Sequence, residues 1–497
     1  MKKYVIGLDI GTTSAKAVVF DYDGNAVSEA ESGYRIVHPS PGYAEQDPAE
    51  IEHAAKEVIR TAMEQAKISV RQLTGVGLSA AMHSLICIDE NGEALSPSII
   101  WADTRSHEEA AYLKREHHEI YLRTGTPLHP MTPLSKLMWG HKHGKTEWQK
   151  ARYFVSIKEY LIKRWFNEHV VDYSIAAATG MFDIHKHRWD NDALSLAGIK
   201  EAQLFTPVPP TYTMTGLKAD IAAHTGLAAG TPFVIGGSDG PLANLGIGAI
   251  NPGETAVTIG TSGAIRQFSR KPLLDDKQEV FSYSFTDDFW ITGGPSNNGG
   301  TVLNWLKQLW DDGQLTFEEM VGLAGEVEAG AEKLLFLPYL NGERAPFWDA
   351  KARGSFIGLT PTHHKKHMIR AGMEGVIFSI YHIAFALERL GNHHTTLLAS
   401  GGFVRSPLWV QILADVFGKP VHIPDCHQSS AWGAAWVALY SLQEVDSLEG
   451  IKHSIPMKKS YHPNQESHET YQQLFDIYKT LYHQLQTCYS DLHQLKC

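Results

Sequence analysis

One turn-forming sequence occurs twice in this chain, about half its length apart. The first copy, Gly-Leu-Asp-Ile-Gly-Thr-Thr-Ser-Ala-Lys, covers residues 7–16, and the second, Thr-Ile-Gly-Thr-Ser-Gly-Ala-Ile, covers residues 258–265. Each copy runs from an apolar, β-branched segment into Gly and small hydroxyl residues, then back into a strand pattern. One copy alone would be compatible with an ordinary β-hairpin. Two copies predict a chain built from two related halves.

Both turns have the chemistry of a phosphate site. Glycine lets the backbone approach a ligand closely, and consecutive N–H groups form a concavity that binds anions. Neither copy has the Gly-Lys-Ser/Thr ending of a Walker loop. Asp9, just ahead of the first turn, is a candidate ligand of Mg²⁺, directly or through water. Lys16 is either a neutraliser of phosphate charge or a solvent-exposed strand lysine. The candidate phosphate-binding residues of the two turns are Gly11, Thr12, Thr13, Gly260, Thr261 and Ser262.

Composition narrows the class of protein. A chain of 497 residues with 43% hydrophobic content is long enough for two or more domains with complete cores. The net charge of −11 argues against nonspecific nucleic-acid binding, which needs a basic surface. No apolar run reaches the roughly 18 residues of a membrane span, and no signal-peptide region follows the first residues. We therefore expect a cytoplasmic protein that acts on a small molecule.

Cysteine and histidine usage gives no metal signal. The four cysteines, at 87, 426, 488 and 497, lack metal-ligand spacing, so we expect free thiols. The 26 histidines show no helix-spaced ligand set, and we expect most of them to be solvated surface residues. The sequence therefore predicts neither a zinc site nor a disulfide framework.

The predicted elements of the two halves follow one plan. In the first half we expect a β-β-β-α-β order, with a helix that begins after Asp47 and has Pro48 in its first turn. In the second half we expect further strands, then a helix, a buried strand, a helix opened by Gly433 and a long polar helix after about residue 464. The expected strands are 4–10, 16–20, 26–30, 75–79, 232–236, 254–258, 264–268, 280–285, 289–292 and 396–400, and the expected helices include 301–310 and 371–390.

Several motifs outside the repeated turn can be compared with known families. They lie at residues 131–139, 236–240, 342–349, 353–359 and 401–402. Together with residues 7–14 they resemble the FGGY family of carbohydrate kinases over nearly the whole chain. The resemblance implies an α/β fold of two ribonuclease-H-like (actin-like ATPase) domains with the active site in the cleft between them. We place a sugar-binding domain with the first phosphate motif at 1–245 and a nucleotide-binding domain at 246–497, with a helical tail from about 464.

Within the family, residues 123–131, 156–160, 171–174 and 293–300 are most similar to bacterial gluconate kinases. This resemblance implies Mg²⁺-dependent transfer of the γ-phosphoryl group of ATP to the 6-hydroxyl of D-gluconate, yielding 6-phosphogluconate. Two alternatives stay open: xylulose kinase or another sugar kinase of the family, and a noncatalytic actin-like nucleotide-binding protein. The noncatalytic protein would not need Asp239 or the group Trp101, Asp103 and Arg105. A homodimer is implied by the family alone.

The resemblance also implies roles for particular residues. Asp239, which follows a strand and a Gly-Gly turn, is the candidate general base; by itself it could be an Asx-turn residue that closes the strand. Domain closure would bring it to the phosphate and exclude water. The candidate sugar-binding residues are Met82, His83, Ser84, Trp101, Asp103, Arg105, His129, Lys158 and Asp239.

A gluconate carboxylate requires a cationic partner, and the sequence does not choose among Lys158, His129, Lys136 and Arg105. Lys136 belongs to a segment shared with kinases of neutral sugars, so a structural role stays open for it. The same alternative stays open for Arg105 and, less strongly, for Lys158. For the nucleotide, a helix N-terminus near the phosphates and a bare backbone against adenosine are expected. Besides the two turns and Lys16, the candidate ATP-binding residues are Gly300, Asn304, Gly401 and Gly402.

Overall fold

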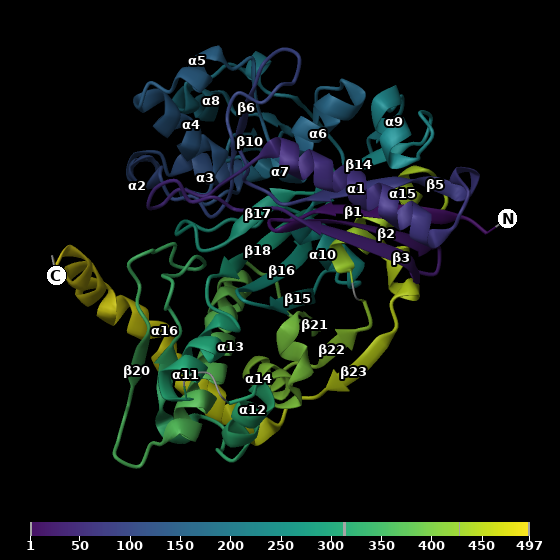
Figure 1. The fold of residues 1–497 in the computed structure, drawn as a ribbon. Coiled ribbons are helices and arrows are strands. Elements are labelled where there is room, and N and C mark those ends of the chain that lie inside the picture. Colours follow the sequence, from purple (N-terminus) through teal and green to yellow (C-terminus); the bar gives the residue numbers. More distant parts are fainter. Residues whose placement is uncertain (1, 312–314, 427, 496–497) are drawn as a thin grey trace. The chain divides into compact units, whose positions relative to one another are not determined.

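The computed structural model describes residues 2–311, 315–426 and 428–495 (Figure 1). The chain forms two compact units. The first contains Met1–Ile250, Phe268–Ile291 and Cys426–Pro456, and the second contains Asn251–Gln267, Thr292–Asp425 and Met457–Cys497. The boundary proposed at 245/246 lies near the first exchange between units. The segments Phe268–Ile291 and Cys426–Pro456 then return to the first unit, so no single cut in the chain separates the two.

A six-stranded sheet with the order β13-β14-β5-β1-β2-β3 forms the centre of the first unit. Strand β1 pairs antiparallel with β2 and parallel with β5, and β14 pairs parallel with β5. The five strands predicted for this region are confirmed to within a few residues. The strands are β1 (Tyr4–Ile10), β2 (Ser14–Asp21), β3 (Ala26–Gly33), β5 (Leu73–Ala80), β13 (Thr213–Met214) and β14 (Phe233–Ser238).

Helix α1 (Pro48–Ala66) packs on β2 and β3 and begins where the sequence predicts. The Asp47 side chain accepts a hydrogen bond from the backbone N–H of Ala49, which caps the helix. Helix α15 (Ser429–Ser441) packs on β1 and β5 and begins before Gly433, so the predicted start was wrong. Gly433 instead permits close packing on α10 (Asp239–Gly246), because a Cβ there would lie 2.1 Å from the Leu242 carbonyl oxygen.

A mainly helical region lies between β5 and β14 in the chain. Its helices are α2 (His107–Glu116), α3 (Glu119–Thr124), α4 (Pro133–Lys142), α5 (Thr146–Lys150), α6 (Ile157–Phe166), α7 (Tyr173–Ala178), α8 (Asn191–Ala197) and α9 (Ala219–Thr225). Its short strands are β6 (Ile86–Ile88), β7 (Ser98–Ile99), β8 (Tyr153–Val155), β9 (Val170–Asp172), β10 (Phe182–Asp183), β11 (Arg188–Trp189) and β12 (Thr206–Val208), and β4 (Glu45–Gln46) pairs with β7.

The second unit repeats the plan of the first. Most of its strands belong to a seven-stranded sheet with the order β17-β18-β16-β15-β21-β22-β23, of which β17 falls in the segment Phe268–Ile291 that is assigned to the first unit. In this sheet β15 pairs antiparallel with β16 and parallel with β21. The duplicated turn therefore joins equivalent strands in both sheets, as the repeat predicts. The strands are β15 (Glu254–Ile259), β16 (Gly263–Ser269), β17 (Phe281–Ser284), β18 (Trp290–Ser296), β21 (Thr396–Ser400), β22 (Val421–Pro424) and β23 (Met457–Tyr461), with β19 (Leu335–Leu337) and β20 (Ser355–Ile357) as a separate hairpin.

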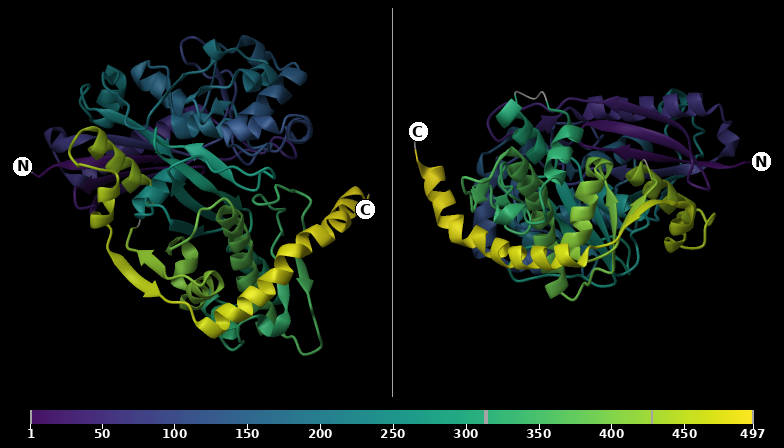
Figure 2. Two further views of the ribbon diagram at one scale, coloured as in Figure 1. Left: turned by 180° about the vertical axis from the view of Figure 1, so that it is seen from behind. Right: turned by 90° about the horizontal axis from the view of Figure 1, so that it is seen from below.

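The helices of the second unit include the predicted C-terminal helix. The others are α11 (Thr301–Asp311), α12 (Phe317–Gly325), α13 (Lys365–Arg389) and α14 (Pro407–Phe417). Helix α16 (Gln465–Gln494) is one continuous helix (Figure 2). Its buried side chains include Tyr471, Phe475 and Tyr478, and the helix packs on α13 and α14. It is thus part of the hydrophobic core of this unit.

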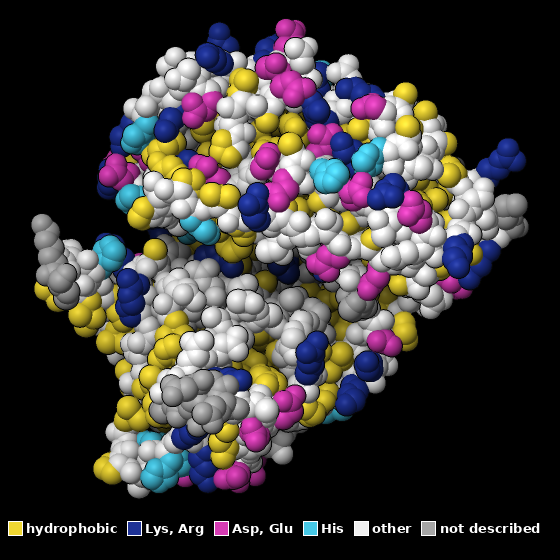
Figure 3. Space-filling view, in the orientation of Figure 1, with side chains coloured by type: hydrophobic (Ala, Val, Ile, Leu, Met, Phe, Trp, Pro, Cys, Tyr) yellow, Lys and Arg dark blue, Asp and Glu magenta, His cyan; other side chains and the backbone are white. Residues whose placement is uncertain are grey.

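The surface shown in Figure 3 carries acidic and basic side chains interspersed, without a large field of one sign. Among the described residues, no helix is both long enough and apolar enough to cross a bilayer. Cys87, Cys426 and Cys488 are free thiols, as predicted, and Cys497 lies outside the described residues.

Candidate active site

Three neighbouring parallel strands of the first unit end at one edge of its sheet, and candidate residues follow each end. Asp9 of β1 lies opposite Ser79 of β5, and Ala80 of β5 lies opposite Ser238 of β14. Asp239 comes next in the chain, as the first residue of α10. The carboxyl ends of parallel strands are where α/β sheets bind ligands. The sheet therefore brings Asp9, the segment 82–84 and Asp239 to one edge.

Asp9 has the environment of a cation-binding carboxylate. It is half-buried, and the Ser79 hydroxyl donates a hydrogen bond of 2.6 Å to its Oδ1. Burial raises the pKa of Asp9, while the Ser79 hydrogen bond and the charges of Lys16 and Lys158 oppose that rise. A bound cation would offset the cost of burying this charge, and carboxylate oxygens are ligands that Mg²⁺ prefers. The residues present therefore fit a Mg²⁺ ion.

The first phosphate turn contacts the Trp101 segment directly. The backbone N–H of Gly11 donates to the Ser14 carbonyl at 3.0 Å and closes the turn. The indole N–H of Trp101 donates to Thr12 Oγ1 at 3.0 Å, and the Gln46 amide donates to the Thr12 carbonyl at 2.7 Å. The structure thus brings one predicted sugar residue and one predicted phosphate residue together. Lys16 is half-exposed, and its Nζ lies 3.6 Å from Glu31 Oε1.

Lys158 lies beneath the turn that precedes Asp239. Its side chain is 1% exposed, and its ammonium donates to Asp172 Oδ2 at 2.8 Å and to the Gly237 carbonyl at 2.9 Å. Burial lowers the pKa of Lys158, and the charge of Asp172 opposes that shift. The ammonium is therefore engaged in binding the backbone of the β14–α10 turn.

Two further features fix the same turn. The Ser174 hydroxyl donates to Asp172 Oδ1 and accepts a hydrogen bond of 2.7 Å from the Ser238 N–H. Gly236 has a φ of 60°, and a Cβ there would lie 2.0 Å from the Leu78 carbonyl oxygen. This position therefore requires glycine. Sequence reasoning found the Gly-Gly turn but missed Asp172 and Ser174 as its supports, since they lie more than 60 residues away.

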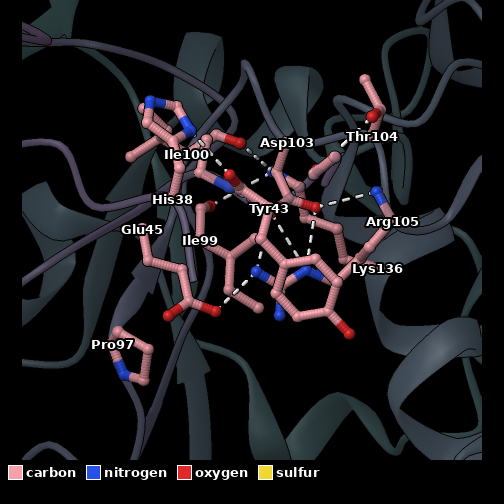
Figure 4. A network of polar contacts seen from close by, with 12 residues as sticks. His38, Tyr43, Glu45, Pro97, Ile99, Ile100, Asp103, Thr104, Arg105 and Lys136 are labelled. Atoms are coloured by element: carbon pink, nitrogen blue, oxygen red, sulfur yellow. Dashed lines mark hydrogen bonds and ion pairs between the residues drawn. The ribbon is translucent and has the colours of Figure 1, made fainter. Parts of the chain in front are cut away.

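Lys136 binds the backbone of the Met82-His83-Ser84 segment. Its buried ammonium donates to the carbonyl of His83 at 2.7 Å. It also donates to the carbonyls of Ile100 at 2.9 Å and Ile99 at 3.2 Å (Figure 4). His83 has a φ of 69°, unusual for a residue other than glycine, and its Nδ1 donates to the Ala178 carbonyl at 2.7 Å. Burial lowers the pKa of Lys136 to about 7. Lys136 therefore joins the 82–84 segment to the residues immediately before Trp101.

The other two residues of the 82–84 segment have different surroundings. Met82 is half-buried and packs against the hydrophobic core of the first unit. Ser84 is buried, and its hydroxyl accepts a hydrogen bond of 3.0 Å from the Ile157 N–H at the start of α6. The segment is therefore held at both ends.

Asp103 and Arg105 form an ion-pair network (Figure 4). Asp103 is fully buried and accepts hydrogen bonds from the Ala44 N–H at 2.7 Å and from the Arg105 guanidinium at 2.7 Å. The same guanidinium donates to Glu45 Oε1 and lies 3.7 Å from the ring centre of Tyr43. Two carboxylates thus compensate the one positive charge of Arg105.

His129 is half-buried in the loop between α3 and α4. Its Nδ1 accepts a hydrogen bond of 3.2 Å from the Met131 N–H, so the neutral ring carries its proton on Nε2. The Thr132 hydroxyl donates to the His129 backbone carbonyl at 3.0 Å. The ring nitrogen Nε2 is thus a hydrogen-bond donor on a fixed loop.

A cavity of about 420 Å³ in the second unit is lined by five of the seven ATP-binding residues predicted there, whereas Gly11, Thr12, Thr13 and Lys16 belong to the first unit. Gly260, Thr261, Gly300, Asn304 and Gly402 line it, whereas Ser262 and Gly401 are neighbours of lining residues. Its volume suits a small-molecule site. The sequence missed its aromatic and charged walls, which have no local signature because they gather from three separate segments. The further lining residues are Ile259, Phe317, Glu318, Phe403, Arg405 and Trp409.

Bare backbone makes the polar end of this cavity. The Gly300 N–H donates to the Gly260 carbonyl at 2.7 Å, so the second phosphate turn is bonded to the start of α11. A Cβ at Gly299 would lie 2.6 Å from the Ser262 carbonyl oxygen. Gly401 has a φ of 96°, and a Cβ added there would lie 2.5 Å from the Ile259 carbonyl oxygen. Both positions require glycine.

Glu343, in one of the motifs found in the sequence, supports this loop. The buried carboxylate accepts hydrogen bonds from the Asn297 N–H at 2.7 Å, the Ser296 hydroxyl at 2.8 Å and the Asn298 amide at 3.3 Å. Burial raises the pKa of Glu343, and these hydrogen bonds oppose that rise. Glu343 therefore fixes the residues immediately before Gly299.

Comparisons with known proteins cover most of the chain. Residues 4–246 match the N-terminal domain of the FGGY family of carbohydrate kinases, and residues 255–442 match its C-terminal domain. A gluconokinase of Bacillus subtilis (strain 168) is 43% identical over 94% of this chain and 93% of its own length. A xylulose kinase of Staphylococcus epidermidis is 30% identical over 94% of each chain.

Solved structures show the same fold. A gluconate kinase from Lactobacillus acidophilus has a TM-score of 0.96 and 36% identity, covering 99% of this chain and 100% of that one. A ligand-bound xylulose kinase from the same species has a TM-score of 0.95 at the same identity and coverage. The predicted fold class is thereby confirmed.

Proposed function

Because the chain belongs to the FGGY family of carbohydrate kinases, we propose that it transfers the γ-phosphoryl group of ATP to the 6-hydroxyl of D-gluconate. The supporting observation is the difference in identity over the same 94% of the chain: 43% to a gluconokinase against 30% to a xylulose kinase. The overall fold does not discriminate between these substrates, since solved structures under both names are 36% identical to this chain.

Asp239 is proposed as the general base. Phosphoryl transfer to an alcohol requires removal of the hydroxyl proton, which the Asp239 carboxylate would accept as the oxygen attacks phosphorus. Its place at the first position of α10, after a turn bound by Lys158 and Ser174, would keep the carboxylate in one orientation. Lys158 is then a positioning residue and no ligand of the substrate.

ATP is proposed to bind in the cavity of the second unit. The aromatic side chains Phe317, Phe403 and Trp409 offer an apolar wall for the base, and the turn at Gly260 offers N–H groups to phosphate. In the first unit, Asp9 would hold Mg²⁺, and Thr12 and Thr13 would donate to phosphate oxygens. When bound, Mg²⁺ neutralises charge on the phosphates.

His129 is proposed as the partner of the gluconate carboxylate. Of the four cationic candidates, Lys136 and Lys158 are buried and donate to backbone carbonyls, and Arg105 is paired with two carboxylates. His129 is half-buried, and because its Nδ1 accepts the Met131 N–H, its Nε2–H would bind the carboxylate as a neutral hydrogen-bond donor in place of the cation expected from the sequence. The variant His129→Ala should therefore raise KM for gluconate while leaving KM for ATP unchanged.

The test is an ADP-release assay with Mg-ATP and D-gluconate, D-xylulose, L-ribulose, glycerol or no acceptor. The proposal requires kcat/KM to be highest for gluconate. A preference for xylulose would keep the proposed base and nucleotide site but reject the carboxylate site. ADP release that does not depend on any acceptor would reject the whole assignment.

A further inference from the structure

A group of metal-ligating side chains lies on the first unit, between α1 and α9. His53 and Glu57 are one turn apart on α1, and such i,i+4 side chains share one face of a helix. His224 lies in the last turn of α9. One ligand atom from each of the three lies within 4.8 Å of the other two. In the part of the chain that the structure describes, this is the one such group of three.

The three side chains already face one another. His224 Nε2 and Glu57 Oε1 are 2.6 Å apart, and the rings of His53 and His224 meet edge to face with centres 6.1 Å apart. His53 is exposed, and the side chains of Glu57 and His224 are 27% and 36% exposed. In Figure 3, histidine side chains gather on this side of the molecule, over α1 near α9. A metal ion has open access from solvent.

The ligand types select the class of ion. Two imidazoles and one carboxylate suit Zn²⁺ and similar transition-metal ions, whereas Mg²⁺ and Ca²⁺ prefer oxygen ligands. Tetrahedral Zn²⁺, with bonds of roughly 2.0–2.1 Å, needs ligand atoms about 3.4 Å apart. The ligand atoms of the three residues now lie within 4.8 Å of one another, and small rotations of the side chains would bring them to that spacing. The fourth position would be filled by water.

Two features oppose metal binding: the 2.6 Å hydrogen bond between His224 Nε2 and Glu57 Oε1, whose proton the metal ion must displace, and Arg60. Its guanidinium lies 2.5 Å from Glu57 Oε2, the carboxylate oxygen that does not face His224. Oε1 therefore stays directed at the histidines, while the positive charge of Arg60 lowers the affinity for a cation. Substitution of Arg60 should tighten the site.

We propose that His53, Glu57 and His224 bind one Zn²⁺ ion on the surface of the first unit and thereby link α1 to α9. The site lies on α1 and α9 and not at the carboxyl ends of β1, β5 and β14, which carry Asp9 and Asp239. His53 and Glu57 have helix spacing in the sequence, but the third ligand, His224, is 167 residues from Glu57, so the group of three could not be found there. Zn²⁺ would raise the melting temperature of the protein without taking part in phosphoryl transfer.

The experiment titrates the full-length chain, freed of metal by a chelator, with Zn²⁺ by calorimetry and with Co²⁺ by visible absorption. We expect one tight site with the absorption of tetrahedral Co²⁺. His53→Gln and Glu57→Gln should each weaken binding at least tenfold. Arg60→Gln should strengthen it. His453→Gln, an exposed histidine of the same unit, is the matched control and should change nothing.

His53 is exposed on its helix, so His53→Gln should not disturb folding. Without metal, the melting temperature of this variant should equal that of the wild type, and weaker Zn²⁺ binding would then not reflect misfolding. Three results would overturn the proposal. They are the absence of stoichiometric binding, binding that survives both His53→Gln and Glu57→Gln, and equal weakening by His453→Gln. Gluconate phosphorylation measured with Mg-ATP should be the same in the wild type and His53→Gln, so the outcome is independent of the proposed function.

Discussion

Replacing Lys158 by Met tests whether this lysine positions the catalytic turn or binds substrate. Asp172 receives three hydrogen bonds on Oδ1, from the Ser174 N–H, the Ser174 hydroxyl and the Ile175 N–H. Its Oδ2 has Lys158 at 2.8 Å. Lys158→Met would leave the Asp172 charge, 1% exposed, without its counter-ion, and the Gly237 carbonyl without this donor.

The expected loss of stability follows from the burial of the Lys158–Asp172 ion pair. Removing one partner of a buried ion pair costs about 3–5 kcal/mol, because the remaining charge stays desolvated. Lys163 on the same helix is the matched control. It is 5% exposed, but its ammonium donates to neutral partners, the Asn167 side chain at 2.7 Å and His169 at 3.1 Å. Lys163→Met should therefore cost about 1 kcal/mol.

Urea unfolding followed by tryptophan fluorescence measures the loss of stability in Lys158→Met and in Lys163→Met. Steady-state kinetics gives kcat for gluconate. We expect Lys158→Met to lower kcat by about 10- to 100-fold, since small displacements of a catalytic group have effects of this size. Adding Asp172→Asn should restore at least half of the lost stability without restoring kcat. A positioning role for Lys158 would be contradicted if Lys158→Met lost no more stability and kcat than Lys163→Met. A change in KM for gluconate alone would also contradict it, because that result would make Lys158 the carboxylate ligand.

Three further predictions concern other parts of the site. Asp239→Asn should lower kcat by at least about 10²–10⁴-fold with an unchanged melting temperature, and near-normal turnover would remove Asp239 as the base. Gly299→Ala should raise KM for ATP and leave KM for gluconate unchanged in steady-state assays, because its Cβ would meet the Ser262 carbonyl at 2.6 Å. Lys136 has a pKa of about 7 in the folded protein against 10.5 as its ordinary value, so unfolding takes up a proton between these pH values. The free energy of unfolding should therefore rise with pH across this window, and urea titrations at pH 6.5 and 9.5 should show a smaller rise in Lys136→Met than in the control Lys142→Met.

The strands around both phosphate turns could be predicted because their signals are local. A β-branched run, a Gly and hydroxyl residues are contiguous in the chain, and β1 has the predicted bounds 4–10. The same holds for Asp47 and Pro48 at the start of α1, where capping depends on neighbouring residues.

The residues that hold the catalytic turn in place could not be predicted, because their contacts join distant parts of the chain and each residue type allows two interpretations. Lys158 is a charged residue in a segment near the site, and in the sequence it is equally a ligand for a carboxylate or the partner of a buried aspartate. Only the distances to Asp172 and Gly237 distinguish these roles. Phe403 and Trp409 were not singled out in the sequence; both are buried, and both line the nucleotide cavity.

The two copies of the turn differ at one position in a way that separates their roles. Asp9 of β1 faces Ser79 of the parallel strand β5 and accepts its hydroxyl at 2.6 Å. Thr258 of β15 faces Ser400 of the parallel strand β21, and their hydroxyls are 2.9 Å apart. Each of these residues lies two positions before the glycine of its turn, so the two hydrogen bonds are equivalent. One fold position thus carries a carboxylate in one copy and a hydroxyl in the other.

This equivalence predicts that Asp9→Thr folds normally, because the chain already accommodates a threonine–serine pair at the same place in the second unit. The variant removes a half-buried charge, whose pKa burial raises, so its melting temperature should equal or exceed that of the wild type. Its kcat should fall by several powers of ten, and the dependence of the remaining rate on Mg²⁺ concentration should weaken. A folded Asp9→Thr protein with the wild-type Mg²⁺ dependence would show that the carboxylate copy has no part in holding the ion.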